Sequence, residues 1–199
     1  MRDEILAYKR ERILQEAVKL FYERGFTGTT LDDIAAALGV TKPFIYTHFK
    51  SKVELLGAIC LPTIEMSLEA ASIAMASPGS ASARLRRLIT DFTGVVMRRQ
   101  ANIAVYFREE MHMDAVTRAD IDAKRGNFDR ILSELLREGV ATGEFQIPDV
   151  SLTALAMGGM ISWAYTWYRP NGRLAVEELS VRMADVAAQM VGMHQPAVV

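Results

Sequence analysis

A short cationic segment holds the side chains of this chain that are best suited to phosphate. Between Thr41 and Lys52 there are three lysines and one histidine, and the first acidic residue beyond them is Glu54. Such a local positive field attracts the phosphate groups of a nucleic acid. The formal net charge of the whole 199-residue chain is −1, which excludes a strongly basic nucleic-acid coat, so a nucleic-acid site has to rest on this local charge.

Two short helices are expected to position this segment. Thr30 precedes an apolar set at helical spacing, and Asp33 follows three positions later, which forms a capping box and predicts a helix start at Leu31. Gly39 directly follows Leu38 and can adopt the left-handed conformation that ends a helix. A first helix from Leu31 to Leu38 is therefore expected, with a tight turn after it.

A second helix is predicted over Lys42–Phe49. Thr41 can cap it, and Pro43 lies in its first turn, where a missing N–H is tolerated. Ser51 and Glu54 form another capping box, which opens a third helix. A helix-turn-helix inserts its second helix into the major groove of DNA. The alternative, a helix pair of a protein that never binds DNA, stays open on spacing alone.

The run T-T-L-D-D-I-A-A-A-L-G-V-T-K-P-F-I-Y-T-H-F-K-S-K-V-E-L-L resembles the signature of TetR-family transcriptional regulators. The matching positions are Thr29, Thr30, Ile34, Ala35, Gly39, Val40, Tyr46, His48, Phe49, Lys52 and Leu55. Leu38 stands where the family often has alanine, and Thr41 where it often has serine. The resemblance implies an all-α, TetR-like fold. It implies a three-helix DNA-binding head with the helix-turn-helix at residues 1–51, and an effector-binding and dimerisation body at residues 52–199.

The resemblance also implies which residues face double-stranded operator DNA. The second helix would enter the major groove, and the residues near its base edges would be Lys42, Pro43, Phe44 and Thr47. Phe44 would meet a thymine methyl group. Phosphate contacts, which position a protein without reading sequence, would come from Thr30, Thr41, Tyr46, His48 and Lys52. Further phosphate candidates on the preceding helix are Arg2, Lys9 and Arg10. The operator is expected to be a near-palindrome.

The rest of the chain is predicted to be helical, because no alternating apolar and polar run of strand length occurs. A helix over Asp3–Arg24 comes first, with Ile5 on its apolar face. A long helix from Lys52 to about Met75 contains Pro62, which either kinks this helix or breaks it in two. The body then follows as helices at about Ala83–Arg99, Asn102–Glu110, Thr117–Thr142, Val150–Tyr168 and Leu174–Met193.

The last two of these helices are expected to pair with those of a second copy. Gly158 and Gly159 lie inside the predicted Val150–Tyr168 helix, where each glycine costs up to about 1 kcal/mol relative to alanine. Paired glycines there suggest that something approaches the helix backbone closely. In the TetR family the last two helices of each subunit form a four-helix bundle across a two-fold axis, so the resemblance implies a homodimer. Core packing within a monomer is the alternative.

The segment WYRPNGRLAVEEL, from Trp167 to Leu179, resembles a segment of a TetR subset that controls lipid, fatty-acid or sterol catabolism and responds to acyl-CoA thioesters. The usual version has serine or threonine as the helix cap before the glutamate pair. This chain has Ala175 there, a departure that concerns helix stability more than ligand choice. The resemblance implies a small apolar effector, with an acyl-CoA or another lipid-like metabolite as its class.

Bulky apolar residues of the body are candidates for binding that effector. The chain has 11 methionines, and methionine adapts to irregular apolar partners. The candidate lining residues are Phe92, Met97, Phe107, Met111, Phe128, Met160, Trp163 and Trp167. Plain core packing is the alternative for each of them. The arginines that could meet a carboxylate or phosphate of the effector, or simply lie on the surface, are Arg98, Arg99, Arg108 and Arg169.

The motifs of the common enzyme classes are missing from the sequence. It contains no P-loop, G-x-S-x-G, H-E-x-x-H or paired-cysteine motif, so we expect neither an enzyme nor a cofactor nor a metal site. His48, His112 and His194 are scattered, although His112 near Glu109, Glu110 and Asp114 leaves a helical metal-dependent enzyme as a rival. The single cysteine, Cys60, cannot form an internal disulfide, and no signal peptide or uninterrupted apolar span is evident, which favours the cytoplasm.

These observations predict a homodimeric, ligand-responsive transcriptional repressor that an effector releases from its operator. An activator of the same fold is the alternative, because the sequence does not separate activation from repression. A shift of the long helix that follows the head would change the spacing of the two heads, and the family uses this helix for that purpose.

Overall fold

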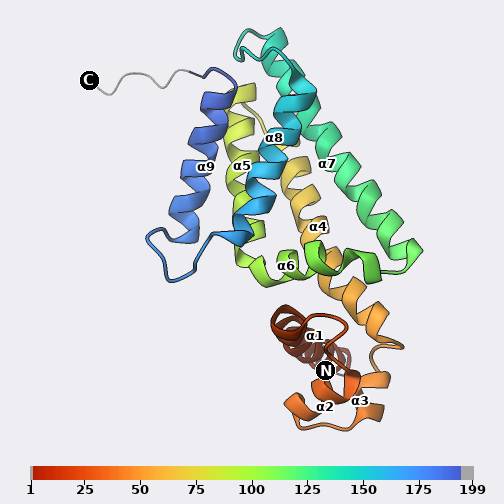
Figure 1. Ribbon diagram of the computed structural model, residues 1–199. Helices are drawn as coiled ribbons and strands as arrows, with labels where there is room; N and C mark the ends of the chain where they lie inside the picture. Colours follow the sequence, from red (N-terminus) through yellow and green to blue (C-terminus); the bar gives the residue numbers. More distant parts are fainter. Residues whose placement is uncertain (1, 194–199) are drawn as a thin grey trace. The chain divides into compact units, whose positions relative to one another are not determined.

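Figure 1 shows the computed structural model, which describes residues 2–193. These residues form α-helices and two short 3₁₀ helices and contain no strand, in agreement with the all-α prediction. The elements are α1 (Arg2–Arg24), α2 (Leu31–Leu38), α3 (Lys42–Tyr46), α4 (Lys52–Ala76), α5 (Ala81–Arg98), α6 (Gln100–Glu109), η1 (Glu110–His112), α7 (Ala115–Ala141), α8 (Val150–Ser162), η2 (Trp163–Thr166) and α9 (Val176–Met190).

The first of two compact units consists of Met1–Thr63 and Gln100–Ile121. It holds α1 to α3, the first half of α4, α6 and η1. One apolar face of each helix supplies its core, which includes Ile13, Ala17, Phe21, Ile34, Ile45, Phe49, Leu55, Leu56, Ile59, Ile103 and Tyr106. α1 packs against both α2 and α6, so it supports the helix-turn-helix from behind.

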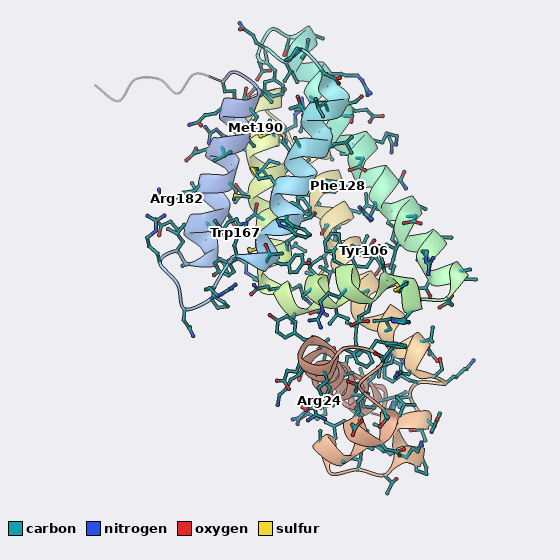
Figure 2. All side chains as sticks on the ribbon, viewed as in Figure 1. Arg24, Tyr106, Phe128, Trp167, Arg182 and Met190 are labelled. Carbon is teal, nitrogen blue, oxygen red and sulfur yellow. The ribbon has the colours of Figure 1, made fainter. Side chains whose placement is uncertain are left out.

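The second unit consists of Ile64–Arg99 and Asp122–Val199, and α5 is its central helix. α9 runs along α5 and α8 packs beside it, as Figure 1 shows. The core of this unit includes Leu85, Leu88, Ile89, Phe92, Val96, Leu132, Leu135, Leu136, Met157, Ile161, Met183 and Ala187. Phe128, labelled in Figure 2, extends from α7 to this core, where its ring centroid lies 4.5 Å from that of Phe92.

α4 is one helix of 25 residues that continues through Pro62, so the predicted alternative of a break into two helices is wrong. The sequence passes from the first unit to the second inside this helix, after Thr63. Its length would also suit a membrane span, as would the mean hydropathy of 1.3 of an 18-residue stretch within it. Leu55, Leu56 and Ile59 lie in the core of the first unit, however, which is typical of an apolar core helix.

The predicted helix Val150–Tyr168 is shorter in the structure, because α8 ends at Ser162 and the 3₁₀ helix η2 follows. The hydroxyl of Thr166 donates to the carbonyl of Trp163 at 2.9 Å, and the Trp167 N–H bonds to the carbonyl of Ala164 instead. Such side-chain bonds compete with the α-helical pattern. The first helix also departs from the prediction, since Ile5 is 50% exposed and the packed face of α1 begins only at Ile13.

Candidate nucleic-acid interface

The turn between α2 and α3 has the predicted caps. The Thr30 hydroxyl accepts from the Asp33 N–H at 3.1 Å, and the Asp33 carboxylate accepts from the Thr30 N–H at 2.7 Å. The Thr30 hydroxyl also donates to the Asp33 carboxylate at 2.6 Å, and this bond, followed by the bond from the Thr30 N–H, lowers the pKa of the Asp33 carboxyl. Gly39 has a φ of +67° and ends α2 in the left-handed conformation. The capping box and the glycine stop are therefore confirmed.

The predicted helix Lys42–Phe49 is too long, because α3 ends at Tyr46. Thr41 takes the N-cap position of α3, but its side chain makes no capping hydrogen bond. At the other end the Thr47 hydroxyl donates to the carbonyl of Phe44 at 2.7 Å and so competes for a carbonyl of the last turn. The proposed base-reading helix is therefore a short element that depends on its neighbours for its position.

Arg10 on α1 holds the chain just after α3. Its guanidinium donates to the carbonyl of His48 at 2.8 Å and lies 4.0 Å from the centre of the Phe49 ring. The next N–H, that of Lys50, donates to the carboxylate of Glu54 at 2.7 Å. Arg10 was a candidate for phosphate, but these contacts direct its guanidinium into the protein. It braces the end of α3, a role that the sequence alone did not suggest.

Lys52, the first residue of α4, makes a second set of inward contacts, with the loop between α1 and α2. Its ammonium donates to the carbonyls of Phe26 at 2.7 Å and Thr29 at 2.8 Å, and lies 4.2 Å from the centre of the Phe26 ring. The imidazole of His112 also stacks on Phe26, at 5.0 Å between ring centroids. Since two of the three ammonium donors of Lys52 are used internally, it braces the loop before α2. Its phosphate contact stays a prediction that one remaining N–H would have to serve.

One face of α3 is free of packing. Ile45 is fully buried, whereas the neighbouring side chains on the outer face, Lys42, Pro43, Tyr46 and Thr47, are exposed. Tyr46 is 49% exposed, so its hydroxyl is accessible to a ligand. The ammonium of Lys42 and the phenol of Tyr46 are hydrogen-bond donors of the kind that meet phosphates and base edges, whereas the Thr47 hydroxyl already donates to Phe44 and offers its oxygen as an acceptor.

Phe44 and His48 form a half-buried pair beside this face. Their rings lie 5.1 Å apart in a T-shaped arrangement, and the ammonium of Lys9 lies 5.6 Å from the Phe44 ring centre. Burial lowers the pKa of the His48 imidazole, and the positive charges of Lys9 and Arg10 lower it further. His48 is therefore neutral near pH 7, and the positive field of this segment comes from lysines and arginines rather than from histidine.

Asp32 is a member of this surface that the sequence reading missed. Its carboxylate accepts from the Lys42 ammonium at 2.6 Å, across the turn between α2 and α3. This hydrogen bond and the negative charge of Asp32 raise the pKa of Lys42. The predicted cationic segment begins at Thr41 and therefore did not include Asp32. The signal was present, because Asp32 lies ten positions before Lys42 and the predicted turn brings the starts of the two helices together.

The structure divides the predicted effector-lining residues. Phe92, Met97 and Phe128 are buried in the second unit, and Met160 is half-buried there. Phe107 is half-buried and belongs to the first unit, as does Met111. The remaining side chains face outward, with exposed fractions of 73% for Met111, 60% for Trp163 and 52% for Trp167. Figure 2 shows Trp167 at the end of the α8 segment. In the single chain these three do not line an interior.

Three of the four candidate arginines, Arg98, Arg108 and Arg169, have side-chain contacts within the protein. Arg98 forms an exposed ion pair with Glu177 at 3.0 Å. Arg108 donates to the carbonyl of Tyr22 at 2.9 Å, within the first unit. Arg169 donates to backbone carbonyls of its own turn. None of these contacts points to an anionic ligand.

α8 presents an exposed face without any charge. The helix Val150–Ser162 contains no Asp, Glu, Lys, Arg or His, yet Leu152 is 65% exposed and Leu155 is 63% exposed. Gly159 and Trp163 continue the same face at helical spacing. A Cβ added at Gly158 or Gly159 would meet nothing within 4 Å. This face, which we call the α8 apolar face (Leu152, Leu155, Gly159 and Trp163), is uncovered in the single chain.

Two side chains of the cluster around His112 lie close together. Glu109 is 8% exposed, and its carboxylate lies 3.7 Å from the His112 imidazole. Within residues 2–193 no group of three His, Cys, Asp or Glu side chains could hold a metal ion. His194, the third histidine, lies outside the described residues.

Comparison with known families matches both parts of the chain. Residues 13–59 match the family described as bacterial regulatory proteins, tetR family. Residues 78–191 match the family described as tetracyclin repressor-like, C-terminal domain. The first match includes the helix-turn-helix, and the second spans α5 to α9.

Individual proteins give the same result. The HTH-type transcriptional repressor KstR2 of Mycolicibacterium smegmatis is 26% identical over 175 residues, which are 87% of this chain and 85% of KstR2. The crystal structure of the TetR-family regulator PfmR from Thermus thermophilus is similar with a TM-score of 0.83 and 30% identity, over 89% of this chain and 97% of PfmR. A structure of AibR in complex with isovaleryl coenzyme A and operator DNA is similar with a TM-score of 0.77 and 26% identity, over 94% of this chain and all (100%) of AibR.

Proposed function

Because the chain belongs to the TetR family of DNA-binding transcriptional regulators, we propose that it is a homodimeric repressor that a small apolar effector releases from its operator. The observation that carries this proposal is the outer face of α3, where Lys42, Tyr46 and Thr47 are exposed while Ile45 is buried. A helix with donors outside and one apolar anchor inside is suited to a groove that is lined by acceptors.

We assign two roles to the residues around α3. Lys42, Pro43, Phe44 and Thr47 lie near base edges, and Phe44 contacts a thymine methyl group. The residues that contact phosphate are Thr30, Thr41, Tyr46, His48 and Lys52. His48 acts as a neutral hydrogen-bonding group, because burial and the nearby cations keep its pKa low. Each half of a near-palindromic operator binds one α3.

A second copy of this chain covers the α8 apolar face in our proposal. An exposed helix face with Leu152 and Leu155 and no charge is a liability in a monomer but suits a self-complementary dimer interface. Open space above Gly158 and Gly159 leaves room for a partner helix to approach the backbone. α9 lies next to α8 in the same unit and completes the interface, as in other members of the family.

The effector class that we propose is an acyl-CoA thioester or another lipid-like metabolite. Support comes from the WYRPNGRLAVEEL segment and from the similarity to AibR, which has been solved with isovaleryl coenzyme A. Phe92, Met97 and Phe128 in the second unit provide the apolar contacts. Trp163 and Trp167 are exposed and contribute only if the effector site extends to the dimer interface. Release from DNA needs a differential affinity of only a few kcal/mol (about 1–3) between the two conformers.

The domain assignment is part of the proposal, with a DNA-binding head at residues 1–51 and an effector-binding and dimerisation body at residues 52–199. A transcriptional regulator works where its DNA lies, so the cytoplasm is the expected compartment. An activator of the same fold remains the second candidate, since an identical α3 face would serve both. Membership of a family of regulators argues against the metal-dependent enzyme.

The test measures binding of the purified protein to DNA from upstream of its own gene, across a salt series. The same titration is repeated with a panel of acyl-CoA thioesters and the matching free fatty acids. Sequence-selective binding that one thioester releases supports both regulator and effector class. Selective binding that ignores the whole panel keeps the regulator and refutes the acyl-CoA effector. Transcription from the bound promoter in vitro separates a repressor from an activator.

A further inference from the structure

Two exposed charges face each other across the helix-turn-helix. Asp32 is the second residue of α2, and Lys42 is the first residue of α3. Their charged groups are 2.6 Å apart, and their side chains are 61% and 45% exposed. The pair therefore lies on the surface that meets DNA in the proposed function. One of its members, Lys42, is the residue that we assign to a base edge.

Stability does not explain this pair. Exposed ion pairs contribute little to folding, and many contribute nothing measurable. The neighbouring acid, Asp33, already caps α2 through Thr30, so Asp32 is not needed for the helix start. A carboxylate on a DNA-facing surface also opposes binding, because it repels phosphates. Asp32 thus lowers the general affinity for DNA, and its structural return is limited to the small favourable effect of a negative charge in the first turn of α2.

The geometry of the ammonium gives Asp32 a use. A lysine ammonium has three donors, and one of them is engaged by the Asp32 carboxylate. Two donors remain for acceptors such as O6 and N7 of guanine. A free lysine is a mobile point charge that binds any phosphate, whereas a lysine held by a partner presents its donors in a fixed direction. The Asp32 carboxylate also neutralises the charge of Lys42 and so removes much of the sequence-independent attraction of this lysine for phosphates.

We propose that Asp32 is a specificity-determining residue that acts through Lys42. It holds the ammonium toward the base edges and cancels its attraction for phosphates, so that Lys42 contributes to binding only where a base supplies acceptors. This inference rests on the proposed role of α3 as the DNA-reading helix. It assigns to α2 a part in sequence discrimination, in addition to its role as the supporting helix.

The experiment compares the full-length parent with Asp32→Asn, using a duplex library with a random central sequence. Sites selected by the parent are sequenced, and affinities for one selected duplex and for the unselected pool are measured across a salt series. We expect Asp32→Asn to bind the unselected pool more tightly, with a slope of log K against log salt that is steeper by about 0.9. The ratio of selected to unselected affinity should fall about tenfold.

Two further variants identify the route through Lys42. In a Lys42→Ala background, Asp32→Asn should no longer change the ratio, because the held ammonium is gone. Glu23→Gln removes an exposed carboxylate from α1 and controls for the change of net charge. Thermal unfolding should be the same for parent and Asp32→Asn, since both charges are exposed.

Each possible result either supports or overturns the proposed role of Asp32. Equal gains in affinity for the selected duplex and the unselected pool would show plain charge removal and overturn the role of Asp32. An effect of Asp32→Asn that is as large without Lys42 would overturn the route through it. A parent protein that selects no site at all would overturn the proposed function itself, and this inference with it. The predicted fall in the ratio, dependent on Lys42, supports both.

Discussion

The exposed faces of α3 and α8 are both unpacked, but they differ in chemistry. The outer face of α3 carries an ammonium, a phenol and a hydroxyl from Lys42, Tyr46 and Thr47. The α8 apolar face carries Leu152, Leu155, Gly159 and Trp163, on a helix without a charged residue. A face rich in hydrogen-bond donors suits a phosphate-bearing partner, whereas an apolar face suits a partner with the same kind of surface.

The two faces also differ in how the protein supports them. α3 has five residues, and the guanidinium of Arg10 points inward to the His48 carbonyl just after it, while the ammonium of Lys52 holds the Phe26 and Thr29 carbonyls in the loop before α2. α8 has 13 residues and rests on the apolar core through Met157 and Ile161. The short helix with a polar outer face is therefore supported by hydrogen bonds around it, while the longer helix with an apolar outer face is supported by burial of its other side.

The largest effect is expected from placing a charge on the α8 apolar face. Leu155→Glu would bury an unpaired carboxylate twice in a symmetric dimer, which should raise the dimer dissociation constant by more than about 100-fold. Sedimentation equilibrium measures this constant directly. Val140→Glu makes the same change at an exposed apolar site on α7 and should leave it unaltered. A Leu155→Glu protein that dimerises like the parent would place the subunit interface elsewhere.

The next effect concerns Lys52, the cation that braces the loop before α2. Lys52→Met removes two hydrogen bonds to carbonyls and the contact with the Phe26 ring, so the free energy of unfolding should fall by about 2 kcal/mol. Urea denaturation measures the loss. Lys50→Met, at an exposed lysine two residues earlier, should cost little. If Lys52 instead serves mainly phosphate, its variant will keep its stability and show a salt slope that is shallower by about 0.9.

A smaller effect is expected on the outer face of α3. Tyr46→Phe removes one hydroxyl from a side chain that is 49% exposed, so stability should not change. Loss of a hydrogen bond to a charged phosphate should weaken DNA binding by about 1.5 kcal/mol, or roughly tenfold. Selected and unselected DNA should lose equally, because phosphate contacts do not read sequence. Fluorescence anisotropy measures both affinities, and Tyr8→Phe on α1 is the matched control. A loss confined to the selected site would move Tyr46 to a base edge.

Local signals were readable from the sequence around the helix-turn-helix. The capping box of Thr30 and Asp33 and the glycine stop at Gly39 depend on residues within a few positions of each other, and the structure has both. The contacts of Arg10 with His48 and of Lys52 with Phe26 were not readable, because 38 and 26 positions separate the partners. A charge near a DNA-reading helix can point outward or inward, and sequence spacing does not distinguish the two.

The same limit explains the effector residues. Periodicity places Leu155, Gly159 and Trp163 on one face of a helix, but it does not say whether that face is covered. Apolar character therefore predicted an interior position for Trp163, Trp167 and Met111, whereas all three are exposed in the single chain. Burial is decided by the packing of distant helices, and an uncovered apolar face is itself information about a partner.

The smallest effect is expected at Glu144, which belongs to neither face. The carboxylate of Glu144 accepts hydrogen bonds from the N–H groups of Ser82 and Ala81 at the start of α5. These bonds, of which those with Ser82 have the largest effect, lower the pKa of Glu144 from 4.5 to about 2. A pKa that is lower in the folded state means that the ionised group stabilises the fold above about pH 4.5 and that this stabilisation is lost as the pH falls toward 2. Glu144→Gln should therefore lower the free energy of unfolding by about 1 kcal/mol at neutral pH, and the gap from the parent should close in acid. Urea denaturation across this pH range measures the gap, with Glu134→Gln, in an exposed pair with Arg130, as the control.

DNA affinity and dimerisation at neutral pH should not change, because neither the outer face of α3 nor the α8 apolar face includes Glu144. A gap that stays constant in acid would mean that the cap acts through its hydrogen-bonding geometry and not through its charge.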